Sequence, residues 1–149
     1  MKSIVMIYLL SLGIFSSFLF QNKTKKESIK AGLEIYQDFC LQCHLSSGIG
    51  VSGVFPPLKA SNYLLENTNL SIAGIKYGLK GKIIVNNEEY NGVMLRQGLD
   101  DEEVADVMNF ILNEWGNQTT AFITPNQVSK IPKSLVEWAS LVPTGMPLR

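Results

Sequence analysis

Apolar positions recur with a helical period in two stretches of the chain. In residues 28–40, Ile29, Leu33 and Tyr36 repeat at intervals of three or four, which predicts an amphipathic helix that runs into Cys40. Ser28 is the expected N-cap of this helix. In residues 101–116 the apolar stripe is longer, has a period near 3.6 and comprises Val104, Val107, Met108, Ile111, Leu112 and Trp115. This second stretch predicts the strongest helix of the chain.

The ends of the second helix are marked by charge and by glycine. Acidic residues occupy positions 100–103, where they cap the helix and favour its dipole, and Gly116 is expected to stop it. Between the two helices, residues 45–58 contain three glycines and two prolines, which indicates a loop folded against a surface.

Shorter elements are predicted elsewhere. Residues 61–66 and 71–77 favour two short helices, the second ended by Gly78. The sequence "KIIVNNEEYNG" has Asn86 and Asn87 between apolar positions, which is typical of a small hairpin. Thr124 and Pro125 predict a short helix through Val128, and later prolines keep the remaining tail from being regular for long.

The N-terminus differs from the rest of the chain. An apolar run from Ile4 to Phe20 follows Met1 and Lys2, as in a secretory signal peptide. As a helix the run would measure about 25 Å, somewhat less than a membrane core. Residues 1–22 are therefore predicted to be a signal peptide or an N-terminal membrane anchor. We expect an exported protein that is periplasmic or attached to the outer face of the cytoplasmic membrane.

Composition limits the remaining possibilities. The chain has 149 residues, of which 46% are hydrophobic and 17% charged, and its formal net charge is zero. These values fit one ordinary domain and exclude a disordered polyelectrolyte. They also give no reason to expect nucleic acid as a partner.

The chemistry of the chain is concentrated in "DFCLQCHLSSG", which holds both cysteines, Cys40 and Cys43, and the only histidine, His44. A dithiol redox site would follow a strand and open a helix, whereas this pair ends a helix. A structural zinc site needs four ligands, and only three are present here. Zinc and a dithiol remain the weaker interpretations.

The third interpretation is covalent haem. In CxxCH, two thiols one helical turn apart add to the two vinyl groups of a porphyrin, and the next residue lies under the iron. Cys40 and Cys43 would then be the thioether residues and His44 the proximal ligand of one haem c and its iron. The export signal agrees with this interpretation, because c-type haem is generally attached outside the cytoplasmic membrane.

With this motif, residues 28–115 resemble the class I c-type cytochromes, including cytochrome domains associated with respiratory dehydrogenases, nitrite reductases and oxidases. The resemblance includes "GLEIYQDFCLQCH", "FPPL", "YNGVM" and "EVADVMNFILNEWGN". It implies an all-α fold: a small helical domain around one covalent haem, with a short hairpin or extended segment before the last core helix. Gly32 and Tyr36 would pack against Phe110. We expect this domain at residues 23–116 and a C-terminal extension at residues 117–149.

The resemblance also implies further site residues. Class I members use a methionine before the last helix as the second axial ligand, and Met94 matches that position; a lysine, water or an open site are the alternatives. Leu95 follows Met94 where relatives often have proline. By the family pattern the carbonyl that accepts the second N–H of His44 belongs to Pro56, with Pro57 as the alternative. Nothing in the sequence selects a hydrogen-bond donor for the haem propionates among Tyr63, Tyr90 and Trp115.

These residues imply a function. A haem iron held by histidine and methionine has no open position for a substrate, so we expect a carrier of single electrons in a respiratory chain rather than an enzyme. Its partners would be redox proteins that donate and accept electrons, and no nucleic acid. Two alternatives stay open: a haem subunit of a larger oxidoreductase complex, and a five-coordinate haem protein that senses a gas or acts as a weak peroxidase.

Overall fold

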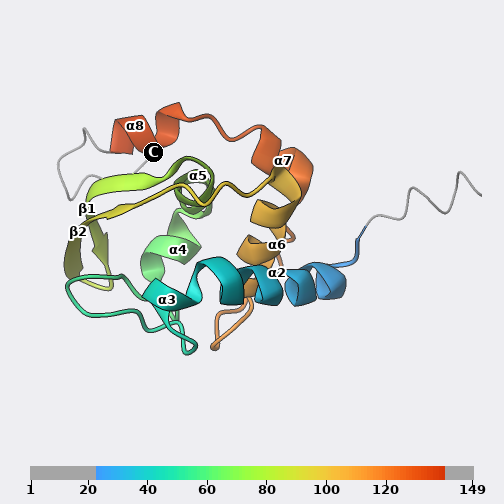
Figure 1. Ribbon diagram of the computed structural model, residues 1–149, viewed down its shortest axis with the longest axis horizontal. Helices are drawn as coiled ribbons and strands as arrows, with labels where there is room; N and C mark the ends of the chain where they lie inside the picture. The colour runs from blue at the N-terminus through green and yellow to red at the C-terminus, as the bar shows by residue number, and fades with distance from the viewer. Residues whose placement is uncertain (1–22, 140–149) are drawn as a thin grey trace, which may run out of the picture.

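The computed structural model describes residues 23–139. The predicted leader at residues 1–22 and the last ten residues of the extension lie outside the described residues. Within the described part, no helix is both long and apolar enough to cross a membrane. The elements follow in the order α2 (Lys25–Phe39), α3 (Leu41–His44), α4 (Asn62–Glu66), α5 (Thr68–Tyr77), β1 (Leu79–Val85), β2 (Glu88–Met94), α6 (Asp101–Ile111), α7 (Pro125–Ser129) and α8 (Ser134–Ala139) (Figure 1).

Helix α2 begins earlier than its apolar stripe predicts. Thr24 is the N-cap, and it forms a capping box with Glu27, whose side chain accepts the backbone N–H of Thr24. The expectation that Ser28 caps this helix is therefore wrong. Ser28 is buried inside the helix, where its hydroxyl donates to Oδ1 of Asp106 at 2.6 Å. A complete capping box satisfies two backbone N–H donors, which a single serine does not, so the helix begins after Thr24.

The most extensive contact between helices joins α2 to α6 (Figure 1). It is centred on Gly32, where a Cβ atom would lie 2.1 Å from the backbone oxygen of Asp106 and 2.8 Å from Cβ of Phe110. One turn later, the ring centroids of Tyr36 and Phe110 are 5.3 Å apart. The predicted packing of Gly32 and Tyr36 against Phe110 is confirmed, and it depends on the absence of a side chain at Gly32.

Helix α6 is capped as predicted but is shorter than predicted. Asp100 is its N-cap and forms a capping box with Glu103. The helix ends at Ile111, with Leu112 as C-cap, and Trp115 (φ 52°) lies in a turn with a left-handed backbone conformation. Trp115 therefore leaves the helical stripe, and its ring packs instead 5.1 Å from that of Tyr36.

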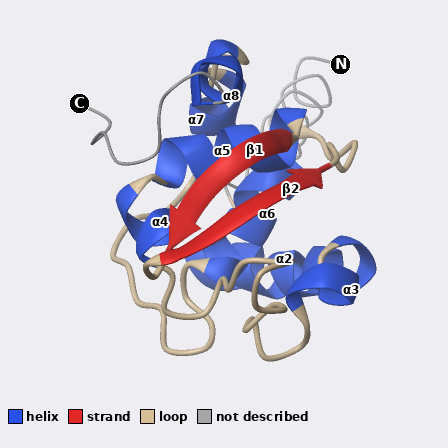
Figure 2. Ribbon diagram, turned by 90° about the vertical axis from the view of Figure 1, so that its left-hand side faces the viewer, coloured by secondary structure: helices blue, strands red, loops and turns tan. Residues whose placement is uncertain are grey.

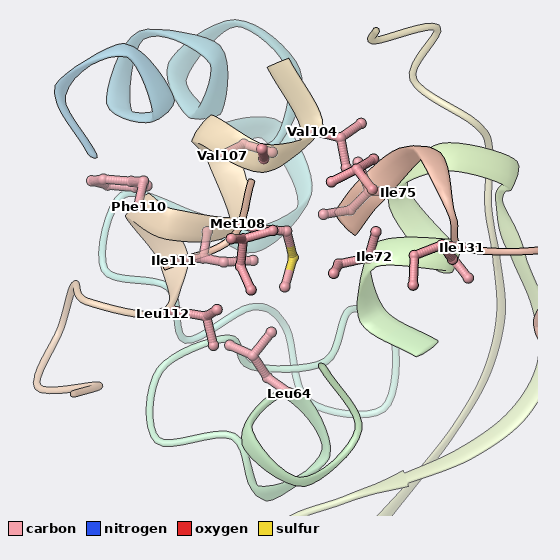
Figure 3. Close-up of a cluster of buried hydrophobic side chains, with 14 of the residues drawn as sticks. Leu64, Ile72, Ile75, Val104, Val107, Met108, Phe110, Ile111, Leu112 and Ile131 are labelled. Atoms are coloured by element: carbon pink, nitrogen blue, oxygen red, sulfur yellow. The ribbon is translucent and has the colours of Figure 1, made fainter. Parts of the chain in front are cut away.

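The hydrophobic core forms where α6 meets α5 and α4. The predicted stripe is buried from Val104 to Leu112, and it meets Leu64 and Ile72 from the preceding helices (Figure 3). Met108 lies in the middle of this cluster with none of its surface exposed (Figure 3). The thioether of Met108 therefore packs among the side chains of the core.

Strands β1 and β2 form a two-stranded antiparallel hairpin in front of α5 and α4 (Figure 2). Asn86 (φ 51°) and Asn87 (φ 67°) make the two-residue turn, in which positive φ matches the twist of the strands. The predicted hairpin is confirmed. The fold is mostly helical, but the prediction of an all-α class needs a correction. The structure also contains this two-stranded sheet, in which each strand has seven residues.

The chain after α6 packs back on the helical core. Thr124 caps α7 and Pro125 occupies its first turn, as predicted, while α8 was not predicted. The side chain of Asn109 donates to the carbonyl of Ile123 and accepts its N–H, both at 2.8 Å. Val128 is fully buried, and the hydroxyl of Tyr77 on α5 donates to the carbonyl of Ile131 at 2.7 Å. The segment from Ile123 to Ile131 is thus part of the packed structure.

We predict that Gly32→Ala lowers the free energy of unfolding by roughly 2 kcal/mol or more, because the added methyl group overpacks the contact between α2 and α6. Glu34→Ala is the matched control: this side chain is exposed on the same helix, and we expect a change within about 0.5 kcal/mol. Denaturant unfolding followed by circular dichroism measures both values. Equal stabilities for the two variants would contradict the role assigned to Gly32.

Candidate functional site

A single helical turn carries the cysteines and the histidine. Cys40 ends α2 and begins α3, and the backbone N–H groups of Cys43 and His44 donate to its carbonyl at 3.2 and 2.9 Å. Cys40 and His44 line an inner cavity, and Cys43 and His44 line the outer groove beside it. The end of α2 therefore delivers three chemically active side chains to one hollow region.

The backbone turns sharply after His44. Leu45 has φ 61° and ψ 163°, a region that is costly for any residue other than glycine. Two hydrogen bonds hold this conformation: Leu45 N–H donates to the carbonyl of Leu41 at 3.0 Å, and the hydroxyl of Tyr36 donates to the carbonyl of Leu45 at 2.6 Å. Tyr36 thus connects the contact between α2 and α6 to the residue beside the imidazole.

The imidazole of His44 is oriented by the following loop. Its Nδ1 lies 3.0 Å from the carbonyl oxygen of Pro56. Because a carbonyl only accepts, Nδ1 carries the hydrogen and Nε2 keeps its lone pair. Burial lowers the pKa of His44, and the hydrogen bond to Pro56 opposes this with a smaller effect. The neutral ring is the form that binds a metal through nitrogen.

A second wall comes from the hairpin. Met94 is the last residue of β2 and pairs with Leu79, the first residue of β1. Met94 is half-buried and lines both hollows together with His44. Met108 lines neither of them, and the other methionines lie outside the described residues.

The two hollows meet in one crevice. Their empty volumes are about 650 and 1610 Å³ with open solvent included. They share His44, Pro56, Leu79, Ile83 and Met94. The inner lining is completed largely by aliphatic residues of α4, α5, β1 and α6, among them Leu64, Ile75, Val85, Val107 and Ile111. A mostly apolar crevice with a few polar groups is typical of a cofactor site.

One polar group in this crevice has no partner. The hydroxyl of Tyr63 is buried and makes no hydrogen bond to any described residue, although buried hydroxyls are nearly always paired. Burial raises the pKa of Tyr63 to about 12, so the hydroxyl keeps its hydrogen. Tyr90 donates to Oε2 of Glu88 at 2.8 Å, and Nε1 of Trp115 donates to the carbonyl of Ser46 at 2.9 Å. Of the three candidate donors, Tyr63 alone is left for a ligand in the crevice.

This set of groups fits haem c better than the other two interpretations. Burial, and to a lesser degree the neighbouring Cys43, raise the pKa of the Cys40 thiol to about 11, which is the opposite of a reactive dithiol. Within residues 23–139 no three side chains of His, Cys, Asp or Glu lie close enough to hold a metal ion together, so this part of the chain supplies no tetrahedral zinc site. The crevice is mostly apolar and offers two thiols, one imidazole and the unpaired hydroxyl of Tyr63. This combination suits a porphyrin with polar substituents.

Comparison with known proteins gives consistent relatives. Over 93 residues the chain is 39% identical to cytochrome c-552 of Thermus thermophilus, which covers 58% of this chain and 69% of that protein. It is also 29% identical over 116 residues to the cytochrome c subunit of the quinone alcohol dehydrogenase of Gluconobacter oxydans, and 27% identical over 120 residues to the gluconate 2-dehydrogenase cytochrome c subunit of Pantoea cypripedii. These matches cover 72% and 73% of the chain but only 24% and 25% of the two subunits.

The family comparison covers the helices and the hairpin that form the crevice. The model of the family Cytochrome c matches residues 29–115, from the first turns of α2 to Trp115, which is more than half of the chain. This range includes the CxxCH motif, the loop with Pro56 and the strand that ends at Met94. The chain therefore belongs to the cytochrome c family.

Proposed function

We propose that this protein carries single electrons between redox proteins, with one haem c attached through Cys40 and Cys43 and with His44 and Met94 as axial ligands. The observation that carries the proposal is that His44 and Met94 line the same apolar crevice from its two walls. The haem supplies the one-electron couple of its iron, Fe(III)/Fe(II). The chain supplies the ligands, their orientation and the exclusion of water.

Each wall of the crevice has its own part in this proposal. On the first wall, the carbonyl of Pro56 fixes the ring of His44 and makes it a stronger donor to iron. On the second wall, the thioether of Met94 would be the second ligand of the iron and would leave no position for a substrate. Aliphatic side chains from α4, α5 and α6 keep water out, which favours a fixed coordination in both oxidation states.

We also propose an exported protein with a leader at residues 1–22, a cytochrome c domain at residues 23–116 and an extension at residues 117–149. The apolar run from Ile4 to Phe20 supports export. Burial of Ile123 and Val128 against the domain supports an extension that belongs to the same folding unit.

A second candidate is a haem subunit of a larger oxidoreductase complex. It is favoured by the relatives that are named as cytochrome c subunits of dehydrogenases. Part of the extension packs within this chain rather than on a partner, because Val128 and Ile131 belong to the core. Co-purification of a second protein from the source membrane would support this candidate, and a monomer that exchanges electrons with soluble acceptors would favour the lone carrier.

A redox titration of the full-length protein followed by absorption spectroscopy tests the function directly. We expect a single one-electron transition, the spectrum of a haem with two thioether links, and the weak ferric band of methionine bound to iron. Rapid carbon monoxide binding by the reduced protein would instead indicate a five-coordinate gas-binding haem. A spectrum without the methionine band would remove Met94 from the proposal.

We predict that Met94→Leu abolishes the methionine band, opens the reduced iron to carbon monoxide and lowers the midpoint potential by on the order of 100 mV, because axial ligands set haem potentials over a wide range. Met108→Leu is the control, since it changes a buried methionine of the core at nearly constant volume. We expect the control to keep both the band and the potential. The assignment is wrong if Met108→Leu loses the band and Met94→Leu keeps it.

We predict that Tyr63→Phe lowers the midpoint potential by roughly 20–60 mV, the value of one hydrogen bond for a one-electron couple. In this proposal the hydroxyl of Tyr63 donates a hydrogen bond to a haem propionate. Without that bond the propionate places more negative charge beside the iron, which favours the ferric state. Tyr90→Phe is the matched control because its hydroxyl is already bonded to Glu88. The same shift in both variants, or in neither, would count against Tyr63 as the donor.

A further inference from the structure

We propose that Gly78 is a positioning residue for Met94: its bare Cα is the surface on which the backbone of residues 94–96 rests. This inference rests on the proposed ligation by His44 and Met94. It concerns how the chain keeps the thioether in place although Leu95, rather than a proline, follows Met94.

Gly78 is a fixed point of the fold. It is the C-cap of α5, and its N–H donates to the carbonyl of Gly74 at 2.9 Å. Helix α5 is held in the core by Ile72 and Ala73, which have at most 1% of their surface exposed. Gly78 has φ 88° and ψ 160°, a conformation that residues with a Cβ rarely adopt. This turn directs the chain from α5 straight into β1.

The segment that carries Met94 passes directly over this point. A Cβ atom at Gly78 would lie 3.0 Å from the carbonyl oxygen of Met94, 3.2 Å from the backbone nitrogen of Arg96 and 3.6 Å from the carbonyl carbon of Leu95. All three contacts are to backbone atoms, which cannot rotate away as a side chain can. An added methyl group at Gly78 would therefore require the backbone of this segment to shift by a few tenths of an ångström.

Leu95 follows the last residue of β2, where the ladder of the hairpin ends, and its side chain is 74% exposed. Its backbone carbonyl accepts a hydrogen bond from Nε2 of Gln97 at 2.6 Å. The register is fixed at Met94 by its pairing with Leu79, the residue next to Gly78. Gly78 and Leu79 together thus form the support on which the methionine segment lies.

The test compares alanine substitutions at two glycines that have nearly the same positive φ but differ in what an added Cβ would contact. Gly78→Ala places a methyl group against the methionine segment. Gly116→Ala is the matched control, because Gly116 has nearly the same φ, 89°, and a Cβ there would meet nothing within 4 Å. Gly116 also lines neither hollow of the crevice.

In the ferric holoprotein, imidazole competes with Met94 for the iron, and the methionine band reports the native bond. We expect Gly78→Ala to weaken or lose this band and to bind imidazole at least about tenfold more tightly than the wild type. Gly116→Ala should keep the band and the imidazole affinity of the wild type, even where denaturant unfolding shows that its stability is lower. Equal imidazole affinities for the two variants would overturn the proposal.

A second variant keeps the proposal testable if Gly78→Ala does not fold. Leu95→Gly loosens the segment itself and leaves its support in place, so we expect the band to remain and imidazole binding to change by less than about threefold. Loss of the band in Leu95→Gly would show that residue 95, rather than Gly78, holds the ligand. If the wild type itself lacks the band, the proposed Met94 ligation fails first, which separates the two failures.

Discussion

The close approach of α2 and α6 at Gly32 is the constraint on which the rest of the site depends. Because no side chain separates the helices there, Tyr36 reaches both the ring of Phe110 and the carbonyl of Leu45. The end of α2 is thereby placed relative to the core before the CxxCH turn begins. The positions of the two thiols and the imidazole therefore depend on the contact at Gly32, which lies about two to three helical turns earlier in the chain.

The helices of the core and the chemistry of the CxxCH turn could be predicted from the sequence because both are local. A stripe of period 3.6 fixed the buried face of α6 from Val104 to Leu112, and two asparagines located the hairpin turn. The errors are local too. The sequence pattern predicts Ser28 as the cap of α2 and a helix as far as Trp115, because such patterns do not show which hydrogen-bond arrangement at a helix end is complete.

The rest of the site depends on contacts between distant parts of the chain. The roles proposed for Tyr63 and Gly78 rest on what surrounds these residues in space: one hydroxyl without a partner among the described residues and one Cα beneath another backbone. A single sequence contains no signal for either. The same holds for the packing of Ile123 to Ile131 on the core, which is fixed by the side chain of Asn109 and the hydroxyl of Tyr77.

The two walls of the crevice differ in how they are connected along the chain. The contact between His44 and Pro56 closes a loop of 12 residues, whereas α4, α5 and β1 separate His44 from Met94 along the chain. Short loops close at a smaller entropic cost and sooner than long ones. The contact that orients the imidazole is therefore closed at a smaller entropic cost than the one that brings Met94 to the same crevice.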